Sequence, residues 1–235
     1  MQDLTLPGRG RAGPSPTTAG IRSAPLRQLA LMLLMAATTG LAHGQREPVV
    51  GLPCEGCDSV FVGLPAAQLG ARARIAPASE PGVPMVVTGR VLDRKGAARP
   101  GIVIYAYQTD SRGLYPEPAG APDFETRRQG RLRAWVKSDD SGRYTFDTIR
   151  PGSYPGEDVP QHIHFHVIEP GCATYYIDDL MFTDDPKLTP GQIRRIARDR
   201  GGPGIVQPLM KDGVWQVSRD IHLGRNIPGH PACGA

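Results

Sequence analysis

Short runs of apolar and β-branched residues alternate with turn-forming residues from Val83 to Leu223. These runs have the length and composition of β-strands, and polar turns such as the DRKG sequence at 93–96 separate them. The predicted strands cover residues 84–92, 101–108, 133–138, 143–149, 162–168, 175–182 and 214–223. Many short strands at intervals of about ten residues are typical of a β-sandwich, so we predict an all-β sandwich over residues 83–225.

One segment indicates a helix instead of a strand. Thr189 and Gln192 have the spacing of a capping box, and Pro190 suits the first helical position. The Gly pair at 201–202 is a stop signal. We therefore expect one short helix near residues 190–199.

The N-terminal segment has the layout of a secretory signal. Arg22 and Arg27 precede an uncharged, largely apolar stretch at 29–42, and small residues flank His43. We expect residues 1–44 to be a signal peptide and the mature chain to be exported to the periplasm or the cell exterior. A retained anchor is the alternative, although the apolar run is shorter than the about 20 residues that span a bilayer. After cleavage we expect no membrane partner.

The predicted signal peptide also accounts for most of the net positive charge of the chain. The net charge is +4, and the residues before 45 contribute most of it. A nearly neutral mature chain does not fit a nucleic-acid binder, because phosphate binding needs clustered cations. We expect no nucleic-acid partner.

Two Gly- and Pro-containing segments flank the predicted sandwich. Residues 45–82 show no sustained hydrophobic period and are predicted to form an N-terminal arm, and residues 226–235 a C-terminal tail. The mature cysteines are Cys54, Cys57, Cys172 and Cys233. An even count in an exported chain predicts two disulfides, with three pairings open. A redox or metal hook at Cys54 and Cys57 is the alternative.

Candidate chemistry concentrates between Tyr115 and His166. His162, His164 and His166 alternate with apolar residues, so on a strand all three imidazoles point to one face. Such a row suits a metal site, and a copper or zinc centre on the three histidines is one interpretation. Tyr154 lies in a Pro- and Gly-bracketed turn at 151–155, and Tyr115 follows the strand predicted at 101–108.

These residues together resemble the intradiol ring-cleavage dioxygenases, the family of protocatechuate 3,4-dioxygenase and catechol 1,2-dioxygenase. The motifs are GRVL at 89–92, DSRGLY at 110–115, DSGRYTF at 140–146, IRPGSYP at 149–155 and PQHIHF at 160–165. The resemblance implies a β-sandwich with non-haem ferric iron held by Tyr115, Tyr154, His162 and His164. It also implies that Tyr154 leaves the metal during catalysis and takes up a proton. Hard phenolate ligands suit ferric iron.

The activity that the resemblance implies is an oxidative ring cleavage. A catechol-like aromatic and dioxygen are the expected partners, the ring opens between its two hydroxylated carbons, and a muconate-type diacid is the product. Because some relatives build their sites across two chains, a homo-oligomer stays open. The alternative is a non-catalytic β-sandwich module of the transthyretin-like type, with or without a metal, which requires neither Tyr115 nor the histidine pair.

One position departs from the family pattern. The family carries an arginine three positions before the first histidine ligand, and this chain has Val159 there. A fixed cation beside a developing negative charge lowers a reaction barrier by several kcal/mol, so the activity depends on a replacement. The arginines considered as replacements are Arg133, Arg143 and Arg150.

Three further polar residues near the motif have two interpretations each. His166 either hydrogen-bonds to the metal ligands or is a polar residue at the far end of the strand face. Glu157 and Asp158 either shape the mouth of the pocket or are solvated loop acids.

Overall fold

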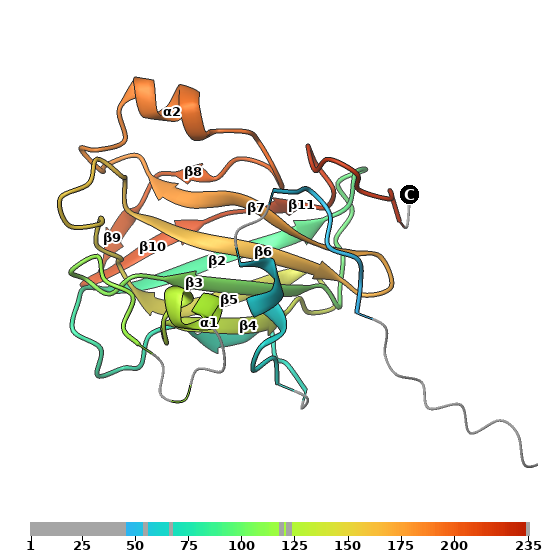
Figure 1. Cartoon of the computed structure of the whole chain (residues 1–235), viewed down its shortest axis with the longest axis horizontal. Helices are drawn as coiled ribbons and strands as arrows, with labels where there is room; N and C mark the ends of the chain where they lie inside the picture. The colour runs from blue at the N-terminus through green and yellow to red at the C-terminus, as the bar shows by residue number, and fades with distance from the viewer. Residues whose placement is uncertain (1–45, 54–55, 66–67, 118–119, 121–123, 234–235) are drawn as a thin grey trace, which may run out of the picture. The chain divides into compact units, whose positions relative to one another are not determined.

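The chain folds into two β-sheets packed face to face, with short helical segments outside them (Figure 1). The computed structural model describes residues 46–53, 56–65, 68–117, 120 and 124–233. The strands are β1 (Arg72–Arg74), β2 (Pro84–Leu92), β3 (Val103–Gln108), β4 (Arg133–Lys137), β5 (Arg143–Ile149), β6 (His162–Glu169), β7 (Ala173–Phe182), β8 (Ile205–Val206), β9 (Leu209–Lys211), β10 (Val214–Ser218) and β11 (Ile221–His222). The helical segments are the 3-10 helix η1 (Cys57–Phe61), α1 (Phe124–Gln129) and α2 (Pro190–Ile196).

The larger sheet has the strand order β1-β5-β2-β10-β9, and β11 also pairs with β2. The smaller sheet has the order β4-β3-β6-β7-β8. Its central strand, β6, runs antiparallel to both β3 and β7. The all-β sandwich predicted from the sequence is therefore confirmed.

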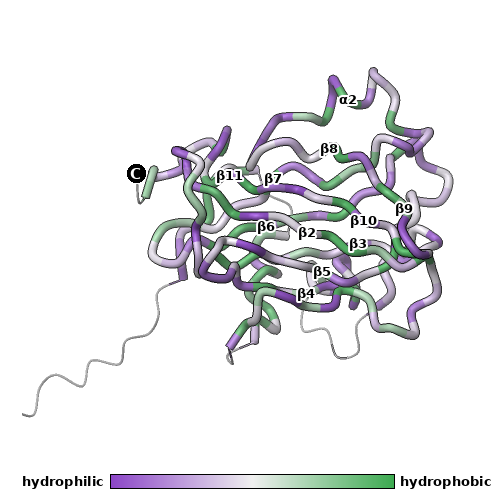
Figure 2. The backbone as a smooth tube through the Cα atoms, turned by 180° about the vertical axis from the view of Figure 1, so that it is seen from behind, coloured by the Kyte–Doolittle hydropathy of each residue, from purple (hydrophilic) through white to green (hydrophobic). Residues whose placement is uncertain are grey.

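The core lies between the two sheets because alternate residues of each strand point inward. Phe146 on β5 and Phe165 on β6 meet across the interface with ring centroids 6.0 Å apart. Figure 2 shows hydrophobic positions interleaved with hydrophilic ones along the strands, as this packing requires. On β6 the inward residues are Ile163, Phe165 and Val167, all fully buried in the core. The three histidines of β6 therefore point to the outer face.

Chain segments cover part of this outer face of the smaller sheet. The 3-10 helix η1 lies in front of β3, β4 and β6 (Figure 1), and its Val60 packs against Tyr105 of β3. The Trp135 indole donates a hydrogen bond to the Val60 carbonyl at 2.8 Å. Gln129 of α1 donates to the Gly56 carbonyl at 3.0 Å, so η1 and α1 hold each other in place. The two helical segments thereby enclose polar side chains on the outer face of the smaller sheet, outside the main core.

The strand predictions hold with small shifts of their ends, but several elements differ from the expectation, among them the short strands β8 and β9, which were not predicted. The strand predicted at 214–223 is divided into β10 and β11, because Arg219 turns its fully buried side chain inward at the break. The predicted arm contributes η1 and the edge strand β1, which pairs with β5. Helix α1 was not predicted. The sequence indicated a single α-helix, whereas the described residues contain two, α1 and α2.

Helix α2 begins as its capping sequence predicts and ends earlier than expected. The Thr189 hydroxyl accepts a hydrogen bond from the Gln192 backbone N–H at 3.2 Å, and Pro190 opens the helix. The helix ends at Ile196. The Arg198 backbone N–H donates a hydrogen bond to the Asp178 carboxylate on β7 at 2.7 Å, so the chain after the helix returns to β7. This return places the residues after α2 beside the outer face of the smaller sheet.

Two predictions concern segments at the ends of the chain. The signal peptide predicted at 1–44 lies outside the described residues, as does Cys54. Cys172 and Cys233 form a disulfide that ties the C-terminal tail to β7, which agrees with one of the expected bridges. Among the described residues, no helix has both the length and the apolar character needed to cross a membrane.

Candidate metal centre

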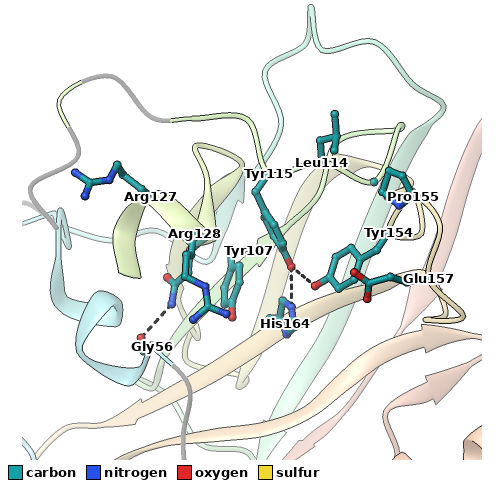
Figure 3. Close-up of a pocket in the computed structure, with 12 residues that line it drawn as sticks. Gly56, Tyr107, Leu114, Tyr115, Arg127, Arg128, Tyr154, Pro155, Glu157 and His164 are labelled. Carbon is teal, nitrogen blue, oxygen red and sulfur yellow. Dashed lines mark hydrogen bonds between the residues drawn. The ribbon is translucent and has the colours of Figure 1, made fainter. Parts of the chain in front are cut away.

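Two phenols and two imidazoles converge on one point above the outer face of β6. The Tyr115 hydroxyl lies 2.7 Å from the Tyr154 hydroxyl and 2.9 Å from Nε2 of His164 (Figure 3). The Nε2 atom of His162 lies 3.1 Å from the Tyr154 hydroxyl and 3.1 Å from the His164 Nε2. The structure therefore brings together all four ligands expected from the sequence, and we call these four atoms the donor cluster.

Both tyrosines lie in turns that are hydrogen-bonded to each other. The first tyrosine turn (110–115) closes on Asp110, whose carboxylate accepts from the backbone N–H of Leu114 at 3.0 Å. The second tyrosine turn (151–155) meets it where the Gly152 N–H donates to the Asp110 carbonyl at 2.8 Å. Gly113 has a φ of +81°, and a side chain there would collide with the Ser153 backbone. The close approach of the two turns sets the distance between the two phenols.

The two histidines are oriented by hydrogen bonds from their other ring nitrogens. His162 Nδ1 lies 2.7 Å from the Pro160 carbonyl, and His164 Nδ1 lies 2.8 Å from the Asp179 carboxylate. Both partners are acceptors, so each Nδ1 carries the proton and each Nε2 presents a lone pair to the cluster. This arrangement is the usual preparation of a histidine for metal binding.

Asp179 is a site residue that the sequence analysis missed. The pairing of β6 with β7 shifts register beside His164, and this irregularity turns Asp179 to the outer face. Its side chain is 15% exposed and faces His164, and it also interacts with Tyr176. The adjacent acids at 178–179, inside an otherwise apolar strand, were the available signal in the sequence.

The donor cluster fits a metal ion by its spacing and by its chemistry. Metal–ligand bonds of about 2.0–2.2 Å put neighbouring ligand atoms roughly 3 Å apart, as the four donor atoms are here. The His162 and His164 lone pairs face each other at 3.1 Å with no proton between them. A cation between the two lone pairs removes this repulsion. Two phenolates and two neutral imidazoles are a hard, anionic set that suits a trivalent ion such as ferric iron.

The electrostatics of the protein alone oppose ionisation of the cluster. Burial raises the pKa of Tyr115 above its ordinary value, and the neighbouring Tyr154 raises it further. Burial also lowers the pKa of His162, and the charge that His164 would carry has the same effect. His162 is therefore held neutral and able to bind a metal. Tyr115 becomes phenolate only when a bound cation supplies the missing positive charge.

Two cavities flank the donor cluster and share Tyr154 and His164. The first cavity, of about 530 Å³, lies on the α1 side and is lined by Tyr107, Tyr115 and Glu157 (Figure 3). The second cavity, of about 550 Å³, lies on the α2 side and is lined by His162, Asp158 and Val159. Glu157 and Asp158 thus border one cavity each, in agreement with a place at the pocket mouth. A molecule in either cavity has direct access to the donor cluster.

His166 takes no part in the donor cluster, although it shares the strand face. Its ring is fully buried, and its Nδ1 lies 3.8 Å from the Cys57 sulfur. Within the described part of the chain, the potential ligand group at this site is His162, His164 and Asp179. A copper or zinc centre on three histidines is therefore not the arrangement found, and His166 does not hydrogen-bond to the other two histidines.

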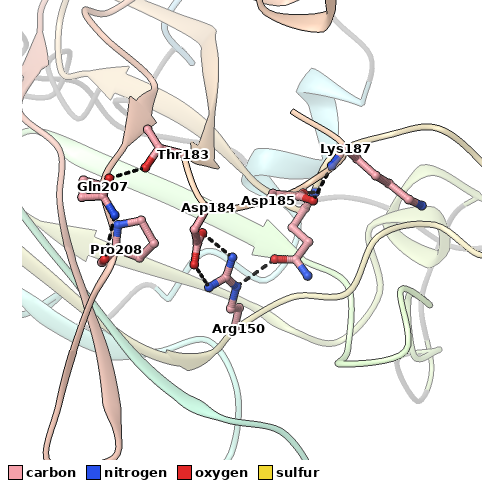
Figure 4. A network of polar contacts seen from close by, with 8 residues as sticks. Arg150, Thr183, Asp184, Asp185, Lys187, Gln207 and Pro208 are labelled. Atoms are coloured by element: carbon pink, nitrogen blue, oxygen red, sulfur yellow. Dashed lines mark hydrogen bonds and ion pairs between the residues drawn. The ribbon is translucent and has the colours of Figure 1, made fainter. Parts of the chain in front are cut away.

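The arginines considered as replacements at position 159 all lie away from the two cavities. Arg150 makes two hydrogen bonds to Asp184, at 2.6 and 2.7 Å, and a third to Gln161 (Figure 4). Arg143 lies on β5 in the other sheet. Arg133 stacks over Trp135 at 5.6 Å. Neither of the two cavities is lined by any of these three arginines.

Comparisons with known proteins agree with this geometry. A family profile described as dioxygenase matches residues 60–201, more than half of the chain. The protocatechuate 3,4-dioxygenase beta chain of Burkholderia cepacia is 30% identical over 109 residues, which cover 44% of this chain and 46% of that protein. The catechol 1,2-dioxygenase of Candida albicans is 32% identical over 106 residues, which cover 37% and 33% of the respective chains. The matched part thus spans less than half of either relative.

Solved structures give the same fold at lower identity. The catechol 1,2-dioxygenase from Acinetobacter sp. ADP1, inhibited by bound mercury, superposes with a TM-score of 0.52 at 20% identity, covering 68% of this chain and 59% of that one. The likeness shows a shared fold. With the family match and the convergent tyrosines and histidines, it leads to one assignment. The chain belongs to the intradiol ring-cleavage dioxygenases.

Proposed function

We propose that this protein is an exported ferric dioxygenase that cleaves catechol-type rings between the two hydroxylated carbons. The observation that carries the proposal is the donor cluster, in which neighbouring donor atoms lie 2.7–3.1 Å apart and both imidazoles are fixed with Nε2 toward the centre. Members of the family use non-haem iron. The signal-like N-terminus and the Cys172–Cys233 disulfide support export.

Tyr115, Tyr154, His162 and His164 would hold the iron. When bound, ferric iron would supply the Lewis acidity that makes a catechol ring reactive toward dioxygen. Carbon–carbon bond cleavage with incorporation of both oxygen atoms gives a diacid, so no further reductant is required.

Tyr154 is the residue best placed to move a proton during substrate binding. It lines both cavities, whereas Tyr115 lines only the first. Its hydroxyl lies 2.7 Å from Tyr115 and 3.1 Å from His162, so a proton taken from a catechol hydroxyl stays within the hydrogen-bonded cluster. Tyr115 has ring contacts with Tyr107 and His164 and lines only the first cavity, so we expect it to remain in place.

The test is metal content and visible absorption of the purified chain, followed by catechol without oxygen. We expect near-stoichiometric iron, a tyrosinate-to-iron charge-transfer band, a shift of that band with catechol, and oxygen uptake when air is admitted. A protein that stays colourless after iron is supplied would refute the ligand assignment and favour the non-catalytic module.

Matched variants separate the ligands from their neighbours. We expect His164→Ala and Tyr115→Phe to lose the iron or its colour. His166→Ala removes an imidazole from the same strand face, and Tyr107→Phe removes a phenol hydroxyl beside His164, yet neither side chain belongs to the donor cluster. Both control variants should keep the iron and its absorption band.

A further inference from the structure

The loop before β6, residues 157–161, leads directly into the first histidine ligand, and we call it the ligand loop. Its Pro160 carbonyl accepts the hydrogen bond that fixes the His162 ring, at 2.7 Å from Nδ1. Proline has a fixed φ, and the residue before a proline is restricted to extended conformations, so Val159 and Pro160 form a stiff pair. A displacement at the start of this pair is therefore passed on to the carbonyl that orients His162.

The segment that follows β7 and enters α2, residues 185–192, holds both ends of the ligand loop. The Asp185 carboxylate accepts a hydrogen bond from the Gln161 backbone N–H at 2.5 Å. The Lys187 ammonium group donates to the Glu157 carbonyl at 2.6 Å. The Lys187 backbone N–H donates to the same Asp185 carboxylate at 3.0 Å, so the two residues that fasten the loop also hold each other (Figure 4).

Gln192 of α2 fastens the middle of the ligand loop. Its side-chain amide donates to the Asp158 carbonyl at 2.7 Å and to the Asp158 carboxylate at 3.1 Å, and a primary amide has the two protons that these bonds require. Gln192 is only 6% exposed, and the Thr189 cap holds its backbone N–H, so the amide extends from a fixed turn of the helix. The contact between Gln192 and Asp158 therefore acts as a clamp directly before the stiff pair of the loop.

We propose that Gln192 is a positioning residue for His162. It fixes the ligand loop at Asp158, and the loop fixes the imidazole through the Pro160 carbonyl. The proposal rests on the proposed function only in that His162 is an iron ligand there. Gln192 and Asp158 also line the second cavity, so the clamp that orients this histidine is part of the wall that a ligand in the cavity contacts.

The first experiment needs no metal. NMR of the full metal-free chain follows the exchange of the histidine Nδ1 protons with solvent, in the unmodified protein and in Gln192→Met, which keeps the size of the side chain and removes both donated bonds. We expect the His162 proton to exchange about tenfold faster in the variant, because exchange requires the ring to open from Pro160. The His164 proton is the internal reference, since Asp179 of β7 holds it at 2.8 Å and the ligand loop does not. Its rate should change by less than about twofold.

Two further variants separate positioning from a general weakening of the fold. Gln192→Lys keeps an N–H donor within reach of Asp158 and should restore the slow exchange at His162. Gln207→Met removes a side-chain amide that donates to the Pro208 carbonyl at 3.2 Å and lines neither cavity, so both histidines should keep their exchange rates. Unchanged exchange at His162 in Gln192→Met, or equal acceleration at both histidines, would overturn the proposal.

The second experiment uses the iron-loaded protein. Competition with a chelator should give a dissociation constant for iron about tenfold higher in Gln192→Met than in the unmodified chain, and within about twofold in Gln207→Met. A protein that binds no iron would refute the proposed function, and the exchange rates would still decide whether Gln192 positions His162. Bound iron with equal affinities and equal exchange rates in Gln192→Met and the unmodified chain would refute the positioning role and leave the proposed function standing.

Discussion

The hydrogen bond from His164 to Asp179 gives a direct test of how the protein prepares its ligands. Asp179→Asn keeps the size of the side chain and removes its charge. Burial alone would raise the pKa of Asp179, but the charge that a protonated His164 would carry and the hydrogen bond from His164 lower it, and the net direction is downward. The residue is therefore an anionic acceptor in the native protein, and the amide is a weaker partner that also presents a donor to Nδ1.

The size of the effect follows from this one contact. A hydrogen bond to a charged group contributes about 1.5–3 kcal/mol, and the 2.8 Å contact with His164 is of this kind. Loss of a hydrogen-bond partner of a metal ligand typically weakens metal binding about 10- to 100-fold. This factor corresponds to a similar range of free energy. We expect Asp179→Asn to raise the dissociation constant for iron by this factor and to change the charge-transfer band.

The assay is competition for iron against a chelator, followed by visible absorption at fixed pH. The matched control is Asp178→Asn, because Asp178 is the neighbouring acid and bonds the Arg198 backbone rather than a donor-cluster residue. The control should bind iron within about twofold of the unmodified chain. An unchanged dissociation constant and an unchanged band in Asp179→Asn would refute the argument that this carboxylate orients His164.

The remaining predictions concern the scaffold around the site. Gly113→Ala should destabilise the chain by about 2–4 kcal/mol and impair iron binding, because it collides with the second tyrosine turn, whereas Gly96→Ala, also at positive φ but in open space, should cost about 1 kcal/mol in urea denaturation. Arg150→Met should lower stability by about 1–2 kcal/mol. The substitution removes the ion pair with Asp184, and Arg150 holds the pKa of Asp184 below its ordinary value. The ion pair therefore stabilises the fold at a pH above the ordinary pKa of an aspartate. The difference in unfolding free energy between Arg150→Met and the unmodified chain should then shrink as the pH falls below about 4. A difference that stays constant with pH would contradict this account. Reducing the Cys172–Cys233 bridge, which spans 61 residues, should cost about 4 kcal/mol, and an unchanged denaturation midpoint would contradict that prediction.

Patterns of period two explain why the strands and the ligand face were predictable. The alternation from His162 to Phe165 fixes which side chains share a face wherever the segment is a strand, so the histidine pair followed from the sequence. The start of α2 was predictable for a similar local reason, since the Thr189 cap acts on an N–H only three residues away. The two tyrosines were identified through the family motifs around them and not through a period.

Elements without a period of their own were not predictable. Helix α1 is six residues long and is held by Gln129 bonding to the carbonyl of Gly56, 73 positions earlier. The contact of Asp179 with His164 depends on a register shift between β6 and β7, which alternation in one strand does not reveal. The occupation of Arg150 by Asp184 likewise joins residues that are 34 positions apart.

The sequence by itself determined the β-sandwich and the strand that carries the histidine pair, because alternation and turn chemistry are local properties of the backbone. The four expected ligands were named by the resemblance to the family and not by these patterns. Only the tertiary structure decided that neighbouring donor atoms lie 2.7–3.1 Å apart, that Asp179 supports His164 and that two cavities flank the donor cluster. Those features depend on the packing of segments far apart in the chain, where the summed contacts of the whole domain, and not a local preference, set the geometry.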